Sequence, residues 1–323
     1  MGWTKRFLTG FVAIPSLFVI LNSPFLFIAF GICVVFWALY EWETLAARIV
    51  DGVRVSAATS KKDDSAAALP PPPSPGRRPI LASVLLTHGV AIGIMAVGTW
   101  SGVYATFGAS VAAAMLCTVV GALRDAVRRP AGEPPLALAC ALMLRVTGVA
   151  FCLCSTAHGL LLYRSGASYE KTWLTGGQGA CLGAILLAFQ ADNGALFLGS
   201  ALGSRAFAKA ISPRKTWEGV AGAFLLPMLT VRLLHAVEHP AVAPLRGDVP
   251  LTSHLALAAA VAFASVAGDL TMSVVKRAAA LSDSGSLIPG HGGLLDRLDS
   301  LMLALPVAYY VMRGAGYAFD AAP

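Results

Sequence analysis

Residues 255–275, LALAAAVAFASVAGDLTMSVV, form an apolar run with one ionisable side chain, Asp269. A run of about 20 apolar residues is long enough to cross the hydrocarbon core of a bilayer as a helix. The stretch therefore predicts a membrane-spanning helix. A carboxylate near the bilayer centre costs about 2.5–3.5 kcal/mol, so Asp269 is a candidate functional residue within this helix.

The composition extends this prediction to the whole chain. Apolar residues make up 57% of the 323 residues, charged residues make up 13%, and the mean hydropathy is +0.71. Soluble domains carry about 25% charged residues. We therefore expect an all-α, polytopic integral membrane protein in which residues 1–323 form a single membrane-embedded domain. About nine spans are expected, at residues 7–22, 24–46, 79–100, 102–123, 136–163, 177–204, 219–235, 253–275 and 298–315.

Basic residues are distributed unevenly among the loops between these spans. Most of the 24 lysines and arginines fall on one side, which is predicted to be cytoplasmic because cations are enriched in cytoplasmic loops. This side comprises the N-terminus and residues 47–78, 124–135, 205–218 and 276–297. The polar loops 205–218 and 276–297 are therefore predicted to share one face of the membrane.

Two segments of the chain differ from a simple series of spans and short loops. Residues 51–78 are rich in Pro, Ala, Ser and charge and lack hydrophobic periodicity, so we predict a disordered insertion there. The first two spans are separated only by residues 22–24. They are either two full crossings or a hairpin that does not fully cross the bilayer.

Asp269 begins a polar stripe along its helix. Ser273, Lys276 and Arg277 follow at i+4, i+7 and i+8, and this spacing places them near one helix face. One interpretation is that a neighbouring cation neutralises Asp269 for packing alone. The stripe continues into a second acidic group, however, and this continuation favours a functional site.

The second acidic group follows in the next loop and contains Asp283, Asp296 and Asp299. Carboxylates at a helix start also complement the helix dipole without any further role. Between them lies PGHGG, residues 289–293, whose glycines allow a phosphate to approach the backbone N–H groups. Carboxylates beside a phosphate-holding turn indicate a divalent cation, and Mg²⁺ is the expected ion because it binds carboxylates together with phosphate oxygens.

The other polar loop has complementary chemistry. ADNGALFLGSALGSRAFAKAISPRKTWEG, residues 191–219, begins with Asp192 inside a predicted span and ends in SPRKTWEG, residues 212–219. Cations, hydroxyls and an aromatic ring suit a nucleoside triphosphate. Taken alone, the same segment is equally typical of a basic turn that contacts anionic lipid headgroups. Its predicted place on the face of the aspartates favours the nucleotide.

These motifs together resemble one family. SVVKRAAALSDSGSLIPGHGGLLDRLD, residues 273–299, closely resembles the signature of phosphatidate cytidylyltransferases, S-x-x-K-R, four residues, K-D, then H-G-G, two residues and D-R-x-D. ADNGALFLG and SPRKTWEG resemble the two upstream motifs of that family, and KRFLTGFVAIP and ALYEWETLA resemble its opening spans. The resemblance implies an all-helical, usually dimeric membrane enzyme. It would make CDP-diacylglycerol and pyrophosphate from CTP and phosphatidic acid, with Mg²⁺ and an assisting monovalent cation such as K⁺, and would bind no nucleic acid.

The resemblance also implies roles for individual residues. The predicted metal ligands are Asp269 and Asp296, with Asp283 and Asp299 as further ligands or supporting carboxylates. The predicted phosphate-holding cations are Lys276, Arg277 and Arg297. The predicted substrate-binding residues are Asp192, Ser212, Lys215, Thr216, Glu218, Ser273, His291, Gly292 and Gly293. Among these, Asp192 is expected to organise the pocket that admits the lipid headgroup.

The chain departs from the family pattern at two positions. Ser282 stands where the family usually has lysine, and Met272 stands where it usually has an acidic residue. Three alternatives therefore accompany the enzyme prediction. They are a CTP-dependent lipid kinase of the polyprenol type, a degenerate paralogue that acts as a membrane scaffold, and a transporter that uses its intramembrane aspartates as a cation path.

Overall fold

A computed structural model describes residues 19–59, 89, 116, 118–120, 135–164, 176–236, 249–288, 292–315 and 317. Most of the predicted spans 7–22, 79–100 and 102–123 lies outside these residues. Residues 60–78 of the predicted insertion and His291 of the predicted site also lie outside them.

Within the described part of the chain, five helices are long and apolar enough to cross a membrane. They are α2 (Pro24–Thr59), α5 (Pro135–Arg164), α6 (Gly176–Leu202), α7 (Trp217–Ala236) and α9 (Leu251–Ala278). The structure thus confirms a multi-pass helical membrane protein. The predicted bounds of α5, α6, α7 and α9 agree with the observed bounds to within three residues.

Helix α2 is longer than its predicted span, 24–46, and it places residues 51–59 of the predicted disordered insertion in a helix. An ion pair between Asp51 and Arg54, three residues apart, joins successive turns of this extension. The prediction of disorder was therefore wrong for these nine residues of the segment. Lack of apolar periodicity does not prevent a helix from continuing when its first turns are already held in place.

The last predicted span, 298–315, differs from the observed structure in its start and length. The chain forms the short helix α10 (Leu295–Leu298), a turn at Asp299 and Ser300, and then α11 (Leu301–Gly314). Helix α11 has 14 residues and is about 21 Å long, less than the hydrocarbon thickness of about 30 Å. The polar turn therefore lies close to the start of a helix that is too short to span alone.

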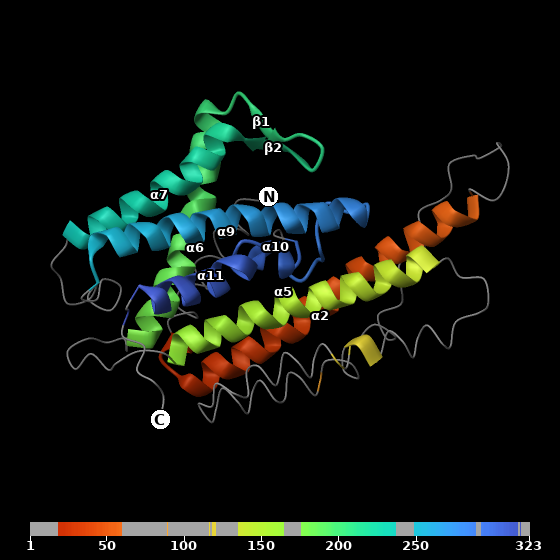
Figure 1. Ribbon diagram of the computed structural model, residues 1–323, viewed down its shortest axis with the longest axis horizontal. Helices are drawn as coiled ribbons and strands as arrows, with labels where there is room; N and C mark the ends of the chain where they lie inside the picture. The colour runs from red at the N-terminus through yellow and green to blue at the C-terminus, as the bar shows by residue number, and fades with distance from the viewer. Residues whose placement is uncertain are drawn as a thin grey trace.

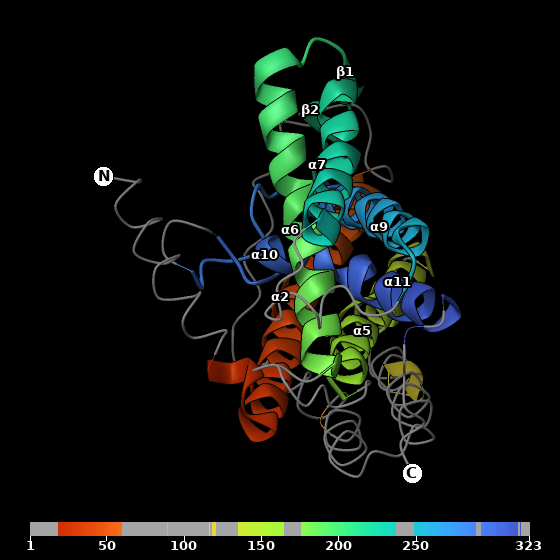
Figure 2. The same cartoon turned by 90° about the vertical axis from the view of Figure 1, so that its left-hand side faces the viewer.

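The predicted loop 205–218 contains a two-stranded antiparallel sheet instead of irregular backbone. Strand β1 (Ala206–Ala208) pairs with β2 (Ser212–Thr216). The rings of Phe207 and Trp217 pack edge to face, with centroids 4.5 Å apart. Figures 1 and 2 show this hairpin at the shared end of α6 and α7, which lie side by side. The sheet is small, so the all-α prediction is confirmed for the bulk of the described residues.

Close approaches between helices set the geometry of the bundle. A Cβ added at Gly194 of α6 would lie 2.1 Å from the backbone oxygen of Gly222 in α7, so this crossing requires glycine. A Cβ added at Gly148 of α5 would lie 2.2 Å from the ring of Trp42 in α2. Trp42 also donates from Nε1 to the Leu144 carbonyl oxygen at 2.7 Å. These contacts hold α2 against α5 and α6 against α7.

Candidate functional site

The two polar segments singled out in the sequence meet in an ion pair. Lys215 Nζ of β2 lies 2.6 Å from Asp269 Oδ2 of α9. Nearby, Arg277 donates from Nε to the Ile211 carbonyl oxygen at 3.3 Å and from Nη1 to the Leu281 carbonyl oxygen at 3.2 Å. Arg277, predicted to hold phosphate, thus ties the hairpin to the C-terminal end of α9. The structure joins motifs that the sequence placed only on a common face.

Asp296 at the start of α10 is the most fully bonded carboxylate of the predicted set. Its Oδ1 accepts from Lys276 Nζ at 2.8 Å, and its Oδ2 accepts from the N–H groups of Ser284 at 2.8 Å and Gly293 at 2.9 Å. Burial opposes charge on Asp296, but the Lys276 ammonium and the two N–H donors hold its pKa below the ordinary value. Asp296 is therefore a charged anchor for the loop around it.

Glu41 of α2 is a site residue that residue-by-residue sequence reasoning missed. It is 3% exposed and accepts from the N–H groups of Leu294 and Leu295 at 2.9 Å. Trp37 Nε1 donates to it at 3.1 Å, and the Ser284 hydroxyl lies 2.8 Å from its Oε2. Its carboxylate thereby caps the N-terminal end of α10. The available signal was an acidic residue inside an apolar span.

The Ser284 hydroxyl links this cap to the aspartate beside it. It lies 2.8 Å from Glu41 Oε2 and 3.0 Å from Asp296 Oδ2. Because one hydroxyl carries one proton, it can donate fully to only one carboxylate at a time. Glu41, Ser284 and Asp296 therefore form one continuous buried network between α2 and α10.

The glycine turn is shaped by the same carboxylates. Gly292 has a φ of +83°, and a Cβ added there would lie 2.8 Å from Asp296 Oδ2. A Cβ added at Gly293 would lie 2.2 Å from the Ser284 hydroxyl oxygen. Glycine is thus required at position 292 by conformation and by space, and at position 293 by space. The N–H of Gly293 already donates to Asp296. The close approach of a phosphate to this turn stays a prediction.

Asp192 occupies the intramembrane end of the site. The hydroxyls of Ser265 in α9 and Ser300 before α11 donate to its Oδ1 at 3.1 and 2.8 Å. Gly268 of α9 faces the same turn, because a Cβ added there would lie 2.3 Å from the Asp299 carbonyl oxygen. Asp192 therefore connects α6 with α9 and with the turn that leads into α11.

Asp299 lies in that turn, outside the five spanning helices. Burial raises its pKa to about 7, and the negative charge of Asp269 adds to the rise, whereas the Lys276 ammonium opposes it. The geometry agrees with this influence, because the Asp299 backbone packs against Gly268, the residue before Asp269. A cation between the two carboxylates would relieve the repulsion between their charges.

The site could hold a magnesium ion through two carboxylates, with the other ligands supplied by substrate and water. Among the residues described, no three His, Cys, Asp or Glu side chains gather closely enough to hold a metal by themselves. Mg²⁺ does not require this, because it commonly binds one or two carboxylates together with substrate phosphates and waters. Asp269 and Asp299 supply two mutually repelling oxygen donors of that kind. Asp283, by contrast, is exposed and accepts from the Ser282 hydroxyl at 2.7 Å.

Two residues predicted to bind CTP have local structural contacts. Thr216 Oγ1 accepts from the Gly219 N–H at 3.1 Å and so caps α7. Glu218 accepts from the Ser204 hydroxyl at 2.7 Å and from the Arg205 N–H at 3.3 Å. These contacts shape the hairpin and the start of α7. A direct contact of either side chain with nucleotide stays a prediction.

Three further residues that were predicted to contact substrate have contacts or exposure that do not define a role. Ser212 begins β2 opposite Ala208 in the sheet. The Ser273 hydroxyl lies 3.5 Å from Asp269 Oδ1, at the limit of a hydrogen bond. Arg297 is exposed on α10. Their substrate contacts stay predictions.

The two departures from the family pattern lie in contrasting environments. Met272 is 0% exposed and belongs to the main hydrophobic cluster of the protein. Ser282 is exposed beside Asp283. The apolar side chain at 272 is therefore matched by an apolar environment, whereas the exposed position 282 leaves room for a longer polar side chain.

Comparison with known proteins places this geometry in a family. The profile of the cytidylyltransferase family matches residues 4–314. A Haemophilus influenzae protein named phosphatidate cytidylyltransferase is 43% identical over 127 residues, which are 39% of this chain and 43% of that protein. A Pseudomonas aeruginosa protein of the same name is 43% identical over 139 residues, which are 43% of this chain and 49% of that protein.

A plant protein has a similar level of identity. The Arabidopsis thaliana protein named phosphatidate cytidylyltransferase 5, chloroplastic, is 43% identical over 117 residues, which are 35% of this chain and 27% of that protein. Each alignment thus spans less than half the length of the relative. The family profile covers far more of the chain than any of these alignments. By that match the chain belongs to the cytidylyltransferase family.

Proposed function

We propose that the protein is a phosphatidate cytidylyltransferase, which transfers CMP from CTP to phosphatidate and yields CDP-diacylglycerol and pyrophosphate. The observation that carries this proposal is the ion pair between Lys215 and Asp269. It joins a hairpin of nucleotide-type residues to a membrane helix with an acidic site at its polar end. Membership of the cytidylyltransferase family supports the same reaction.

The chemistry requires positioning and neutralisation of charge. An oxygen of the phosphatidate phosphomonoester attacks the α-phosphorus of CTP in line, a P–O bond forms, and the bond to the β-phosphate oxygen breaks. Because both substrates are polyanions, they repel one another unless cations lie between them. Lys215 and Lys276 would supply positive charge, since each is already held near the site by an aspartate. The protein then acts mainly by orientation and electrostatic stabilisation.

Of the four predicted metal ligands, Asp269 and Asp299 fit Mg²⁺ best. When bound, the ion would withdraw negative charge from the triphosphate and orient it. Asp296 is less suited, because both of its oxygens are engaged and Oδ2 accepts from two backbone N–H groups. Asp269 pairs with Lys215 through Oδ2, but its Oδ1 has only a 3.5 Å contact with the Ser273 hydroxyl. We therefore propose that Asp296 positions Lys276 and the glycine turn. The assisting monovalent cation remains part of the proposal through the family resemblance alone.

Topology and assembly complete the proposal. The uneven distribution of lysine and arginine supports an active site on the cytoplasmic face. At that face the headgroup of phosphatidate would meet soluble CTP, while its acyl chains stay in the membrane. The family resemblance supports a homodimer.

Product analysis tests the reaction directly. Purified protein is incubated with phosphatidate, Mg²⁺ and CTP labelled at the α-phosphate, and in parallel with CTP labelled at the γ-phosphate. The expected result is α-label in lipid and γ-label in pyrophosphate. Transfer of γ-label to lipid with release of CDP would instead identify a lipid kinase. Absence of lipid labelling from either nucleotide would contradict the enzyme proposal and favour a scaffold.

A further inference from the structure

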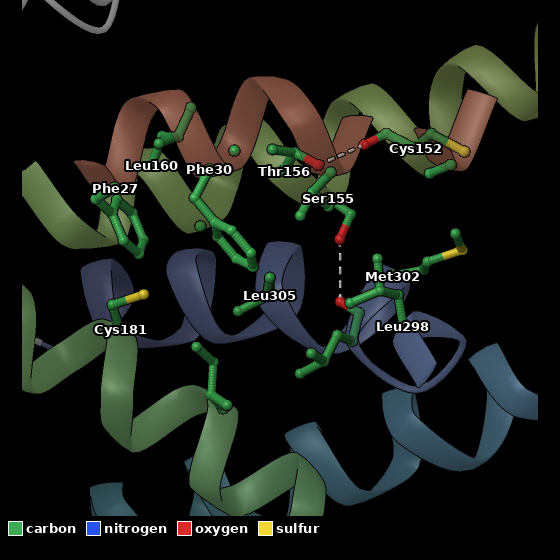
Figure 3. A pocket seen from close by; sticks show the side chains of 16 residues that line it. Phe27, Phe30, Cys152, Ser155, Thr156, Leu160, Cys181, Leu298, Met302 and Leu305 are labelled. Carbon is green, nitrogen blue, oxygen red and sulfur yellow. Dashed lines mark hydrogen bonds between the residues drawn. The ribbon is translucent and has the colours of Figure 1, made fainter. Parts of the chain in front are cut away.

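An apolar cavity lies between α2, α5, α6 and the α10–α11 segment. Its volume is about 110 Å³, and Phe27 and Phe30 of α2, Cys152 of α5 and Leu305 of α11 are among its lining residues. Figure 3 shows these side chains directed toward a common space between the helices. The side chains that line this space leave it open.

The cavity has two hydroxyl-bearing residues in its lining, and both hydroxyls have partners in the protein. Ser155 donates to the Leu301 carbonyl oxygen at 3.2 Å, and Thr156 donates to the Cys152 carbonyl oxygen at 2.9 Å (Figure 3). Water is stable in a cavity only where several polar groups offer it hydrogen bonds. The lining therefore favours an apolar occupant.

The cavity is adjacent in the chain to the acidic site. Leu298 and Leu301 line it, and the two residues between them are Asp299 and Ser300. Ser300 donates to Asp192 at 2.8 Å, on the polar side of the same turn. One short segment thus contributes apolar side chains to the cavity and polar side chains to the site.

The mouth of the cavity lies on a membrane-spanning surface. Phe30, which lines it, is 46% exposed on α2, and α2, α5 and α6 are all apolar enough to cross a bilayer. Spanning helices expose such apolar faces to the acyl-chain region of the membrane or to other apolar segments. An amphiphile with an anionic head and apolar tail would match the site and the cavity together.

We propose that this cavity receives part of one acyl chain of phosphatidate while the headgroup occupies the acidic site, an inference that rests on the proposed function. The volume suits a chain segment, since a cavity of about 150 Å³ in another protein accommodates benzene. Bilayer and cavity are similarly apolar, so the cavity adds little affinity. Its effect is to orient the lipid and to select among acyl chains.

Gly31 offers a way to fill the cavity. It lines the cavity from α2, and a Cβ added there would lie 3.4 Å from Leu160, an ordinary van der Waals distance. Gly31→Ala and Gly31→Leu therefore form a graded series that reduces the space. Gly52→Leu is the matched control, because Gly52 lies on the same helix with no atom within 4 Å of an added Cβ and outside the cavity lining.

The first experiment measures occupancy. Full-length protein in dioleoylphosphatidylcholine nanodiscs is irradiated with phosphatidate carrying a diazirine in one acyl chain, and labelled peptides are identified by mass spectrometry. Labelling of residues 152–160 is expected, with about a tenfold decrease in Gly31→Leu and no decrease in Gly52→Leu. Equal labelling by diazirine-bearing phosphatidylcholine would assign the cavity to bulk lipid and overturn the proposal.

The second experiment measures selection during turnover. The ratio of kcat/KM for dioleoyl over dihexanoyl phosphatidate is expected to fall in order from Gly31 through Gly31→Ala to Gly31→Leu, by about tenfold at the end. An equal loss with both lipids, or an unchanged ratio, would overturn the proposal. If neither lipid accepts CMP from the unsubstituted protein, the proposed function fails, while specific labelling lost in Gly31→Leu would still support a phosphatidate chain in the cavity.

Discussion

Lys215 of β2 and Asp269 of α9 are joined by an ion pair with an Nζ to Oδ2 distance of 2.6 Å. The lysine belongs to the hairpin that follows α6, and the aspartate belongs to a membrane-spanning helix. This pair holds the hairpin over the acidic site. The ammonium of Lys215 is the positive charge at the place where two anionic substrates are proposed to meet.

Substitution of Lys215 tests that charge. Lys215→Met should lower kcat/KM for CTP by about a hundredfold, because a charge-assisted bond of about 2.7 kcal/mol is removed from the transition state. The rate is measured as transfer of α-labelled CMP to phosphatidate. Lys209→Met is the control, since Lys209 is exposed in the same hairpin. Equal losses in the two variants would contradict a specific role for Lys215.

Removal of magnesium tests the proposed metal ligands. Chelation should abolish CMP transfer, and added Mg²⁺ should restore it. Asp269→Asn should raise the Mg²⁺ concentration for half-maximal rate by about tenfold or more, because a neutral amide binds Mg²⁺ more weakly than a carboxylate. Asp51→Asn, on the far part of α2 beside Arg54, should leave the Mg²⁺ dependence unchanged. A Mg²⁺ titration of initial rates decides the matter; coincident curves for all three proteins would rule out Asp269 as a ligand.

Glu41 provides a test of positioning from a distant helix. Glu41→Gln replaces an acceptor by an N–H₂ group that must face the N–H donors of Leu294 or Leu295 or the Ser284 hydroxyl. The resulting loss of about 1–3 kcal/mol should reduce kcat by about 5- to 150-fold. Glu41 touches neither substrate in the proposed site, so KM for CTP should change little.

Glu43→Gln is the matched control for that substitution. Glu43 is also buried on α2, but its carboxylate lies 3.6 Å from Arg145 Nε, away from α10. Both variants should lose thermal stability because each disturbs a buried carboxylate. Only Glu41→Gln should lose kcat in the fraction that remains folded. Parallel loss of kcat in Glu43→Gln would reduce the role of Glu41 to stability alone.

Met272 tests whether its departure from the family pattern limits this protein. Met272→Glu should lower the free energy of unfolding by about 3 kcal/mol or more, because it places a carboxylate in a fully buried apolar cluster. Met272→Leu conserves volume and should cost less than about 1.5 kcal/mol. Thermal unfolding in detergent measures both effects. A stable Met272→Glu variant with increased CMP transfer would show instead that the methionine limits activity.

Local sequence was sufficient for the five long apolar helices that the structure describes. Runs of apolar residues predict spans because their transfer into lipid depends on composition and length. The spacing of Asp269, Ser273 and Lys276 predicts a common face because helical periodicity is a local property. The glycine turn before Asp296 was likewise visible as a motif. Its family resemblance indicated the reaction class.

Packing between distant segments decided the remaining features. Glu41 and Ser284 are 243 residues apart, and their contact depends on how α2 lies against the α10 loop. The pairing of Asp296 with Lys276 and two N–H groups likewise depends on how the α10 loop lies against α9. The number of donors that surround a carboxylate is a property of the folded neighbourhood. Apolar periodicity identifies which helix face is buried, but only the packed bundle determines which polar groups meet there.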